Sequence, residues 1–333
     1  MYQEKYHQQD ITQTSFLITG GAGFIGSNIA EYLLHHGAGK VRILDNFSTG
    51  SIRNIEPFLQ HPAFELIEGD IRDFDTCASA LEGIDYVSHQ AALGSVPRSI
   101  HDPLTSNAVN ISGFLNMLVA ARNAGVKKMV YAASSSTYGD HKGLPKVEDQ
   151  IGHPLSPYAV TKYVNELYAG VFSRTYQFHT VGLRYFNVFG PRQNPDGPYA
   201  AVIPLFVQAA LKHKAPVIYG DGETSRDFTY VANAVQANIK ALFSNIQSHE
   251  VMNVACGERT SLNQLWDLIS RQTSAHVTPE YKEERLGDVK HSLADISKAQ
   301  QLINYNPLIS IQQGLAITIK WYETALQHAE TYN

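Results

Sequence analysis

The sequence predicts an α/β protein, in which a doubly wound parallel sheet is joined to a smaller C-terminal domain of mixed α and β structure. Short apolar segments alternate with helical patterns over the first 185 residues, and this alternation is typical of a parallel sheet covered on both faces. A glycine-rich turn follows the first apolar segment, and after Arg184 the chain becomes richer in Gly, Pro and Asn. These three observations place the sheet in the N-terminal half of the chain.

The predicted strands are short apolar runs, and the predicted helices are longer segments with helical periodicity. The strands cover residues 16–19, 41–44, 64–67, 86–88, 128–132 and 180–184, and the helices cover 25–34, 104–124 and 157–176. Residues 229–252 are predicted to form a helix and a strand that return to the sheet, whereas 253–310 are expected to be broken into short elements. We therefore predict a Rossmann domain of residues 1–185 plus about 229–252, and a second domain of 186–228 plus 253–333.

The composition of the 333 residues argues against several classes of protein. The net charge is −5 and the Lys and Arg residues are scattered, so no nucleic-acid partner is expected. No apolar run approaches the ~20 residues of a membrane span, and residues 1–15 lack the apolar core of a signal peptide. Cys77 and Cys256 have no metal-ligand spacing, so we expect a cytoplasmic protein without a disulfide or a metal site.

The glycine-rich turn, TGGAGFIG at 19–26, has the spacing of a dinucleotide-binding motif. Gly20 would permit the sharp turn, Gly23 would let the backbone approach a pyrophosphate, and Gly26 would let the helix pack closely on the strand. The helix N-terminus would offer N–H groups to the phosphates. A glycine-rich turn that binds no ligand can have the same pattern. The motif therefore predicts a cofactor site only together with other residues.

Two carboxylates supply that context. Asp45 ends the second predicted strand, where it would accept hydrogen bonds from both ribose hydroxyls of NAD and repel the 2′-phosphate of NADP. No Arg follows it in the next five residues, so NAD is the predicted cofactor. Asp70 follows the third predicted strand, and it either contacts the adenine amino group or caps a helix.

Tyr158 and Lys162 form a Y-x-x-x-K pair at the start of a predicted helix, on one helix face. A tyrosine that acts as a base at neutral pH needs its pKa lowered from ~10 to near 7, which takes ~4 kcal/mol. An ammonium one turn away and a cationic nicotinamide would supply this. Ser134, Ser135 and Ser136 follow the preceding strand, at the sheet edge where ligands bind. A hydroxyl there would bond to substrate and tyrosine, or would cap a turn.

Together these motifs resemble the extended short-chain dehydrogenase/reductases, in particular their UDP-sugar 4-epimerase branch and the bacterial UDP-N-acetylglucosamine 4-epimerases of polysaccharide biosynthesis. The resemblance covers nearly the whole chain. It is carried by TGGAGFIGSN (19–28), DNFSTG (45–50), YAASSSTYGD (131–140), PYAVTK (157–162), LRYFNVFGPRQ (183–193), YGDGETSRDFTYV (219–231) and RLGDVKHSLADISKA (285–299).

The resemblance implies a transient oxidation of a UDP-sugar. Tyr158 would take the proton from O4, the C4 hydride would pass to NAD, and the sugar would turn before the hydride returns to its other face. The family also suggests a homodimer through the helices at 104–124 and 157–176. The predicted catalytic residues are Tyr158, Lys162, Ser134, Ser135 and Ser136.

The remaining site residues are predicted from the motifs and the resemblance together. The cofactor contacts are Gly20, Gly23, Phe24, Ile25, Gly26, Asp45, Asn46, Ser48, Thr49, Gly50, Asp70, Ile71, Gln90, Ala91, Ala92, Tyr158, Lys162, Tyr185 and Val188. The substrate contacts are Ser95, Ser134, Ser135, Tyr158, Asn187, Gln193, Ala201, Val202, Tyr219, Arg226, Arg285, Asp288 and Ser292. Two arginines suit a diphosphate because guanidinium binds phosphate oxygens in bidentate fashion, although a surface ion pair is the alternative for Arg226.

Several alternatives stay open. Nucleotide-sugar 4,6-dehydratases resemble this chain but carry Asp-Glu directly after the catalytic Ser or Thr, where this chain has Ser135 and Ser136. A UDP-N-acetylglucosaminuronate 4-epimerase, or another uronate epimerase or decarboxylase, fits the motifs as well. A non-catalytic NAD sensor is disfavoured because Tyr158 and Lys162 are both present. Ser292 stands where hexose-specific members often carry Tyr, which would leave room for an N-acetyl group, unless it is an ordinary loop serine.

Overall fold

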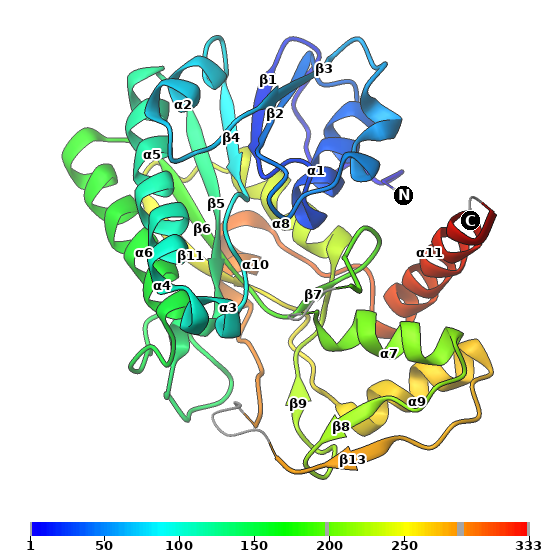
Figure 1. The fold of residues 1–333 in the computed structure, drawn as a ribbon. Coiled ribbons are helices and arrows are strands. Elements are labelled where there is room, and N and C mark those ends of the chain that lie inside the picture. Colours follow the sequence, from blue (N-terminus) through cyan, green and yellow to red (C-terminus); the bar gives the residue numbers. More distant parts are fainter. Residues whose placement is uncertain (1, 197–199, 285–289, 332–333) are drawn as a thin grey trace.

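The computed structural model describes residues 2–196, 200–284 and 290–331 and contains the predicted parallel sheet (Figure 1). Seven parallel strands lie in the order β11-β6-β5-β4-β1-β2-β3. Their bounds are β1 (Ser15–Thr19), β2 (Lys40–Asp45), β3 (Phe64–Glu68), β4 (Tyr86–His89), β5 (Lys128–Ser134), β6 (Thr180–Tyr185) and β11 (His249–Val254). Phe16 on β1 is opposite both Val41 and Tyr86, so β1 lies between β2 and β4.

The sheet is buried on both faces because its strands are apolar at successive positions. Phe16 and Ile18 of β1 belong to one hydrophobic core, whereas Leu17 between them belongs to the other, as the alternation of side chains along a strand requires. The helices α1 (Phe24–His35) and α8 (Val231–Leu242) cover the first face, and α2 (Phe74–Ala80), α5 (Phe114–Asn123) and α6 (Pro157–Tyr176) cover the second (Figure 1).

The predicted helix at 104–124 is helical throughout but not uniform. It consists of α4 (Pro103–Asn107), a π-helical turn η3 (Ala108–Gly113) and α5. π-Helical turns inside α-helices occur frequently at functional sites. Here the turn buries Asn110, whose amide donates to Leu93 O and to Thr161 Oγ1. The wider turn therefore connects the chain after β4 to the start of α6.

The C-terminal region contains the helices α7 (Val202–Leu211), α9 (Leu262–Thr273), α10 (Ser297–Ile303) and α11 (Ile311–Thr331). The prediction of short elements over 253–310 missed α9, which is 12 residues long and begins with a capping box at Ser261. Since α8 and β11 lie on the sheet, we keep the division into 1–185 plus about 229–252 and 186–228 plus 253–333 as a proposal.

The remaining elements are short. They are η1 (Ile52–Asn54), η2 (Glu56–Phe58), α3 (Val96–His101), η4 (Ser135–Tyr138), β7 (Val188–Phe189), β8 (Val217–Tyr219), β9 (Ser225–Arg226), β10 (Thr229–Tyr230), β12 (Thr260–Ser261) and β13 (Glu280–Lys282). Among the helices in the described ranges, none is both long and apolar enough to cross a membrane.

Candidate active site

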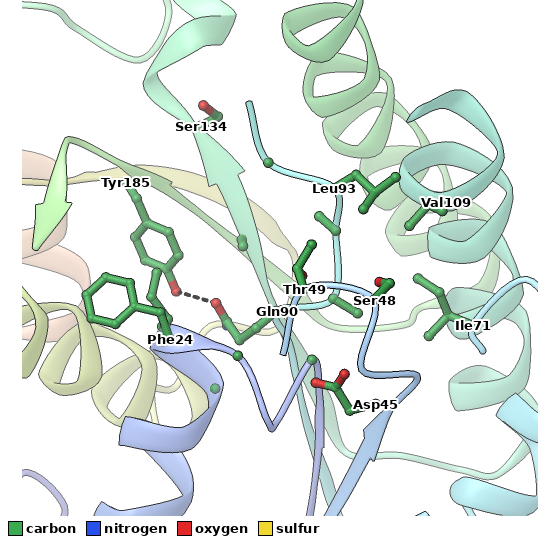
Figure 2. A pocket seen from close by; sticks show the side chains of 18 of the residues that line it. Phe24, Asp45, Ser48, Thr49, Ile71, Gln90, Leu93, Val109, Ser134 and Tyr185 are labelled. Atoms are coloured by element: carbon green, nitrogen blue, oxygen red, sulfur yellow. Dashed lines mark hydrogen bonds between the residues drawn. The ribbon is translucent and has the colours of Figure 1, made fainter. Parts of the chain in front are cut away.

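A cavity of about 450 Å³ lies at the carboxyl ends of the parallel strands (Figure 2). Its lining comes from the chain after β1, the end of β2, the chain after β4 and the end of β5. Successive strands are added toward one edge of the sheet from β1 to β3 and toward the other edge from β4 onward. Ligands of open α/β sheets bind at such a switch point, here between β1 and β4. Figure 2 shows Asp45 and Ser134 at opposite ends of the cavity, so an elongated ligand would span both.

Every predicted cofactor contact except Gly50 lines this cavity. Gly50 supports the lining, since a Cβ at this position would lie 2.9 Å from Asp45 Oδ1. The lining residues that we did not predict are Leu44, Gly69, Leu93, Gly94, Val109, Ala132 and Ala133. Gly69 directly follows β3 and the two alanines lie near the end of β5, so strand ends were the signal for them. Val109 depends on the π-helical turn, for which we found no sequence signal.

The glycines of the first turn are required by close packing. Gly20 has a φ of +65°, and a Cβ on it would lie 2.8 Å from Ala91 N, while a Cβ on Gly26 would lie 2.2 Å from Gly20 O. Gly23 is the N-cap of α1 and has no side chain to accept from the first-turn amides. The start of α1 therefore presents backbone donors and its positive dipole end to the cavity, which suits a pyrophosphate.

Asp45 is buried at the end of β2, with each carboxylate oxygen held by a backbone amide. Ala22 N donates to Oδ2 at 2.9 Å and Phe47 N donates to Oδ1 at 2.8 Å. Burial raises the pKa of Asp45, and these two hydrogen bonds oppose that effect. Each oxygen retains a second lone pair for a ribose hydroxyl. The arrangement fits the ribose of NAD, and the carboxylate also fixes the loop that surrounds the ribose position.

We expect Asp45→Asn to weaken NAD binding by about 1–3 kcal/mol, the scale of a lost charge-assisted hydrogen bond. The amide would also turn an N–H toward Ala22 N or Phe47 N, so the loop loses one of its anchors. Titration calorimetry with NAD on cofactor-depleted protein measures the change. Asp73→Asn, which alters the cap of α2 outside the cavity, is the control. Equal binding of NADP and NAD by the wild type would contradict the role of Asp45.

Asp70 lines the cavity but is already paired. Arg72 donates to both of its oxygens, at 3.0 Å and 2.7 Å, and Asn46 Nδ2 donates at 2.8 Å. The Arg72 guanidinium, as the largest influence, lowers the pKa of Asp70 to about 2. The helix-cap alternative for Asp70 is wrong, because Asp73 caps α2 by accepting from Asp75 N. Contact with an adenine amino group stays a prediction.

Three of the predicted catalytic residues, Ser134, Tyr158 and Lys162, line the other end of the cavity. Lys162 Nζ donates to Ala132 O at 2.8 Å and lies 6.0 Å from the ring centre of Tyr158. Ser134 Oγ accepts from both Ser136 N and Ser136 Oγ, at 3.1 Å and 2.8 Å. Because Ser136 donates to it twice, the Ser134 hydroxyl keeps its own proton available for the Tyr158 phenol.

Burial shifts the pKa values of both Tyr158 and Lys162. Burial raises the pKa of Tyr158, and the hydrogen bond from Ser134 opposes this effect. Burial lowers the pKa of Lys162 to about 8. The serine therefore stabilises the phenolate directly, whereas Lys162 contributes charge only while it is protonated. Ser134 also caps η4, so the cap and the catalytic interpretations describe the same side chain. Ser135 lines the cavity and Ser136 does not.

Ser99, which we did not predict, holds the backbone of Tyr158. Its Oγ accepts from Tyr158 N at 3.0 Å, while Ser156 Oγ caps α6 by accepting from Ala159 N. Thr161 Oγ1 donates to Tyr158 O. The start of α6 is thus held by one bond to α3 and by two local bonds, from its N-cap and from its first turn. A buried serine on a separate short helix carries no sequence signal for this role.

A second cavity of about 540 Å³ adjoins the first, and Asn187 and Val188 line both. The predicted substrate contacts that line the second cavity are Asn187, Gln193, Ala201, Val202, Tyr219 and Arg226. Arg226 Nη1 donates to Ser225 O and Lys290 O. Its guanidinium is therefore held at the wall, as a diphosphate site needs.

The other predicted substrate contacts are placed differently. Ser95 and Ser292 lie outside the linings of both cavities. Ser95 caps α3 by accepting from Arg98 N, with a φ of 112°, and Ser292 N donates to Ser225 O at 3.0 Å. Arg285 and Asp288 lie outside the described residues. The roles of all these residues stay proposals.

Comparisons with known proteins agree with this geometry. A family model described as GDP-mannose 4,6 dehydratase matches residues 17–318. A putative UDP-glucose 4-epimerase of Methanocaldococcus jannaschii is 37% identical over 307 residues, covering 92% of this chain and 97% of the relative. The solved UDP-N-acetylglucosamine 4-epimerase of Methanobrevibacter ruminantium, in complex with UDP-N-acetylmuramic acid, has a TM-score of 0.89 and 42% identity, covering 94% and 99%.

A third comparison adds a structure with a bound cofactor. The UDP-glucuronic acid 4-epimerase of Bacillus cereus, in complex with UDP-glucuronic acid and NAD, has a TM-score of 0.87 and 31% identity, covering 94% of this chain and 100% of that one. The chain belongs to the short-chain dehydrogenase/reductase family, in its UDP-sugar 4-epimerase branch. The predicted family and fold class are therefore confirmed.

Within this family, Ser135 and Ser136 separate the chain from the dehydratases that the matched family model is named after. Dehydration requires an acid and a base beside the catalytic serine or threonine, whereas a serine hydroxyl exchanges a proton poorly at neutral pH. In the structure Ser136 Oγ donates to Ser134 Oγ at 2.8 Å, so the Ser136 proton is already used in this bond. The epimerase branch thus agrees with the chemistry of these two positions.

Proposed function

We propose that this protein catalyses the NAD-dependent C4 epimerisation of a UDP-N-acetylhexosamine, interconverting UDP-GlcNAc and UDP-GalNAc. The observation that carries the proposal is the convergence of Tyr158, Lys162 and Ser134 where the first cavity approaches the second. The first cavity would hold NAD and the second the UDP. The sugar would then lie between them, beside the phenol.

The residues of the first cavity fit NAD. Asp45 would hold the adenosine ribose, the start of α1 the pyrophosphate, and Lys162 the nicotinamide ribose. When bound, NAD supplies a hydride acceptor that returns the hydride within the same turnover. Tyr158 removes the O4 proton and later gives it back, Ser134 bonds O4 and the phenol, and Arg226 keeps the diphosphate in place while the sugar turns.

A uronate substrate is the second candidate, since the Bacillus cereus relative is crystallised with UDP-glucuronic acid. A uronate carries one more carboxylate, which when desolvated requires a cationic partner. Among the described residues that line the two cavities, the cationic side chains are Lys162 and Arg226. In the proposed mechanism Lys162 already serves the phenol and Arg226 the diphosphate. The described lining therefore favours a sugar without a carboxylate.

A panel of UDP-sugars tests the substrate assignment. We expect the pure protein to convert UDP-GlcNAc and UDP-GalNAc into each other without added NAD. This conversion should be faster than the epimerisation of UDP-Glc, UDP-Gal or UDP-N-acetylglucosaminuronate. Chromatography of the products measures each rate. Faster turnover of a uronate would contradict the N-acetylhexosamine assignment and support the uronate assignment. A 4-keto-6-deoxy product would indicate a dehydratase.

Ser292 is the proposed determinant of sugar size. We expect Ser292→Tyr to suppress turnover of the acetylated sugars by about 10-fold or more and to spare the plain hexoses, because overpacking costs ~1–3 kcal/mol where a group must be squeezed in. Rates on UDP-GlcNAc and UDP-Glc measure this selectivity. Ser297→Tyr, on an exposed residue at the start of α10, is the control. Ser292 lies outside the described linings of both cavities. Equal effects on both sugars would show that Ser292 does not contact the sugar.

A homodimer is part of the proposal. Val160, Leu167 and Val171 repeat along α6 and are each close to half exposed, and Leu104 on α4 is 82% exposed. Apolar side chains with this spacing form one helix face, and exposed apolar patches mark interaction sites. We therefore propose that α6 and the 104–124 helix pair with a second copy, which light scattering would detect as twice the mass of one chain.

A further inference from the structure

Asp227 is a fully buried carboxylate that directly follows Arg226, the residue that the proposed function assigns to the diphosphate. Asn187, a predicted substrate contact, donates from Nδ2 to the backbone oxygen of Asp227 at 2.9 Å. Both neighbours line the second cavity, whereas Asp227 itself lines neither cavity. Its side chain points to other parts of the chain, so its role differs from theirs.

Three backbone amides converge on the Asp227 carboxylate. Cys256 N donates to Oδ1 at 2.9 Å, and Gly257 N and Ala294 N donate to Oδ2 at 3.0 Å and 3.2 Å. Burial raises the pKa of this carboxyl to about 6, and the three donors oppose that effect. A charge that is costly to bury therefore joins the chain after β11 to the segment of residues 290–295.

The 290–295 segment, which we call the strap, is held on two sides. On one side Ser225 N donates to Lys290 O at 2.9 Å and Ser225 Oγ bonds His291 Nδ1 at 2.9 Å. On the other side Lys146 N donates to Leu293 O at 2.7 Å, and Asp295 N donates to Lys146 O at 2.9 Å. The strap thus bridges the loop after η4 and the β9 strand that carries Arg226.

Asp227 is the side chain that joins this bridge to a third segment. Backbone bonds hold the strap to Ser225 and Lys146, and the carboxylate additionally fixes Ala294 N, which lies between the two residues bonded to Lys146. Arg226 Nη1 also donates to Lys290 O, so movement of the strap would move the guanidinium. Asp227, which lines neither cavity, is thus linked through the strap to Arg226 in the wall of the second cavity.

We propose that Asp227 is a positioning residue that holds the strap against Arg226, so that the UDP moiety stays bound while the sugar is in its 4-keto form. The inference rests on the proposed function. In that reaction the C4–H bond breaks, its hydride reduces NAD⁺ to NADH, and the O4 proton passes to Tyr158. If the 4-keto UDP-sugar leaves before the hydride returns, the enzyme is left with NADH and cannot complete the turnover.

The test compares Asp227→Asn and Asp227→Ala with a matched control, Asn233→Ala. Asn233 is also buried, and its side chain bonds three backbone groups away from the strap, Leu308 N, Ile309 N and Ile309 O. It also donates to Cys256 Sγ at 3.7 Å, but none of these bonds goes to residues 290–295. Each alanine variant leaves three backbone groups without their side-chain partner. A general loss of stability would therefore affect both proteins, whereas loss of the strap affects only the Asp227 variants.

We expect the Asp227 variants to accumulate enzyme-bound NADH, seen as absorbance at 340 nm, while their epimerase activity declines over successive turnovers. The inhibition constant of UDP should rise about tenfold, the scale of one lost hydrogen bond to a charged group. The wild type and Asn233→Ala should show neither change. Folded Asp227 variants without bound NADH and with unchanged UDP inhibition would overturn the proposal, as would the same NADH signal in the control.

Hydrogen exchange on the wild type keeps the proposal testable if the Asp227 variants do not fold. We expect amides of 290–295 and of Cys256 and Gly257 to exchange more slowly when UDP is added, and unchanged exchange in both segments would contradict the proposal. Failure of the proposed function is distinguishable, since it would appear as absent epimerisation by the wild type. In that case the affinity of the variants for UDP, measured by direct binding, and the hydrogen-exchange measurement still test the role of the strap.

Discussion

Tyr158→Phe should reduce turnover by at least ~10²-fold, the lower end of the range for loss of a general acid–base group. Within the first cavity, Lys162 Nζ lies 6.0 Å from the ring centre of Tyr158, and Ser134 opposes the rise of the phenol pKa on burial. The ring of residue 158 and the backbone bonds that fix it to Ser99 and Thr161 remain in the variant. Folding and cofactor content should therefore be unchanged, and the loss should fall on the rate of the chemical step.

The matched control is Tyr176→Phe, at the end of the same helix. Tyr176 is 48% exposed and packs against Arg122 through its ring, which phenylalanine preserves. Steady-state rates, thermal denaturation and the NAD content after purification compare the two variants. An active Tyr158→Phe protein would show that another residue takes the O4 proton.

Lys162→Met should reduce turnover by about 10²–10³-fold, the range for loss of a preorganised charge next to the reacting group. Burial lowers the pKa of Lys162 to about 8, so the ammonium is present below that pH and is lost above it. Wild-type turnover should accordingly fall as the pH rises through about 8. The variant should show no decline of this origin, since methionine does not titrate.

Lys128→Met is the control for the lysine. Lys128 is also buried, burial also lowers its pKa to about 8, and its ammonium bonds to Ser244 away from the cavity. It should retain the wild-type rate and the wild-type pH profile. A Lys162→Met protein with a normal rate, or the same loss in both variants, would contradict the proposed role of Lys162 beside Tyr158.

The sequence was sufficient for the sheet and for the first cavity because both follow local rules. Strand ends and the glycine turn are encoded by short patterns, and in a parallel sheet the carboxyl ends necessarily meet at one edge. For this reason residues as far apart as Asp45, Gln90 and Ser134 could be assigned to one site before the structure was known. The start of α6 was equally accessible, since Pro157 follows Ser156 as helix-start residues do.

The features that the sequence did not predict depend on long-range contacts. The role of Ser99 requires α3 to meet the start of α6, and the lining by Val109 requires a π-helical turn inside a helix whose periodicity appears uniform. Asp227 has an acidic side chain in a motif attributed to the substrate, but its partners are backbone amides far along the chain. Backbone partners leave no trace in residue type, so no pattern indicated them.

The central claim is a hydride transfer within one active site, and UDP-GlcNAc labelled with deuterium at C4 tests it most directly. Because the hydride taken from C4 returns to the other face of the same carbon, we expect UDP-GalNAc that retains the deuterium at C4, with no label in free NADH. Mass spectrometry and NMR of the product measure this. Epimerised product that has lost the deuterium to water, or NADH released in amounts equal to the substrate consumed, would contradict the mechanism.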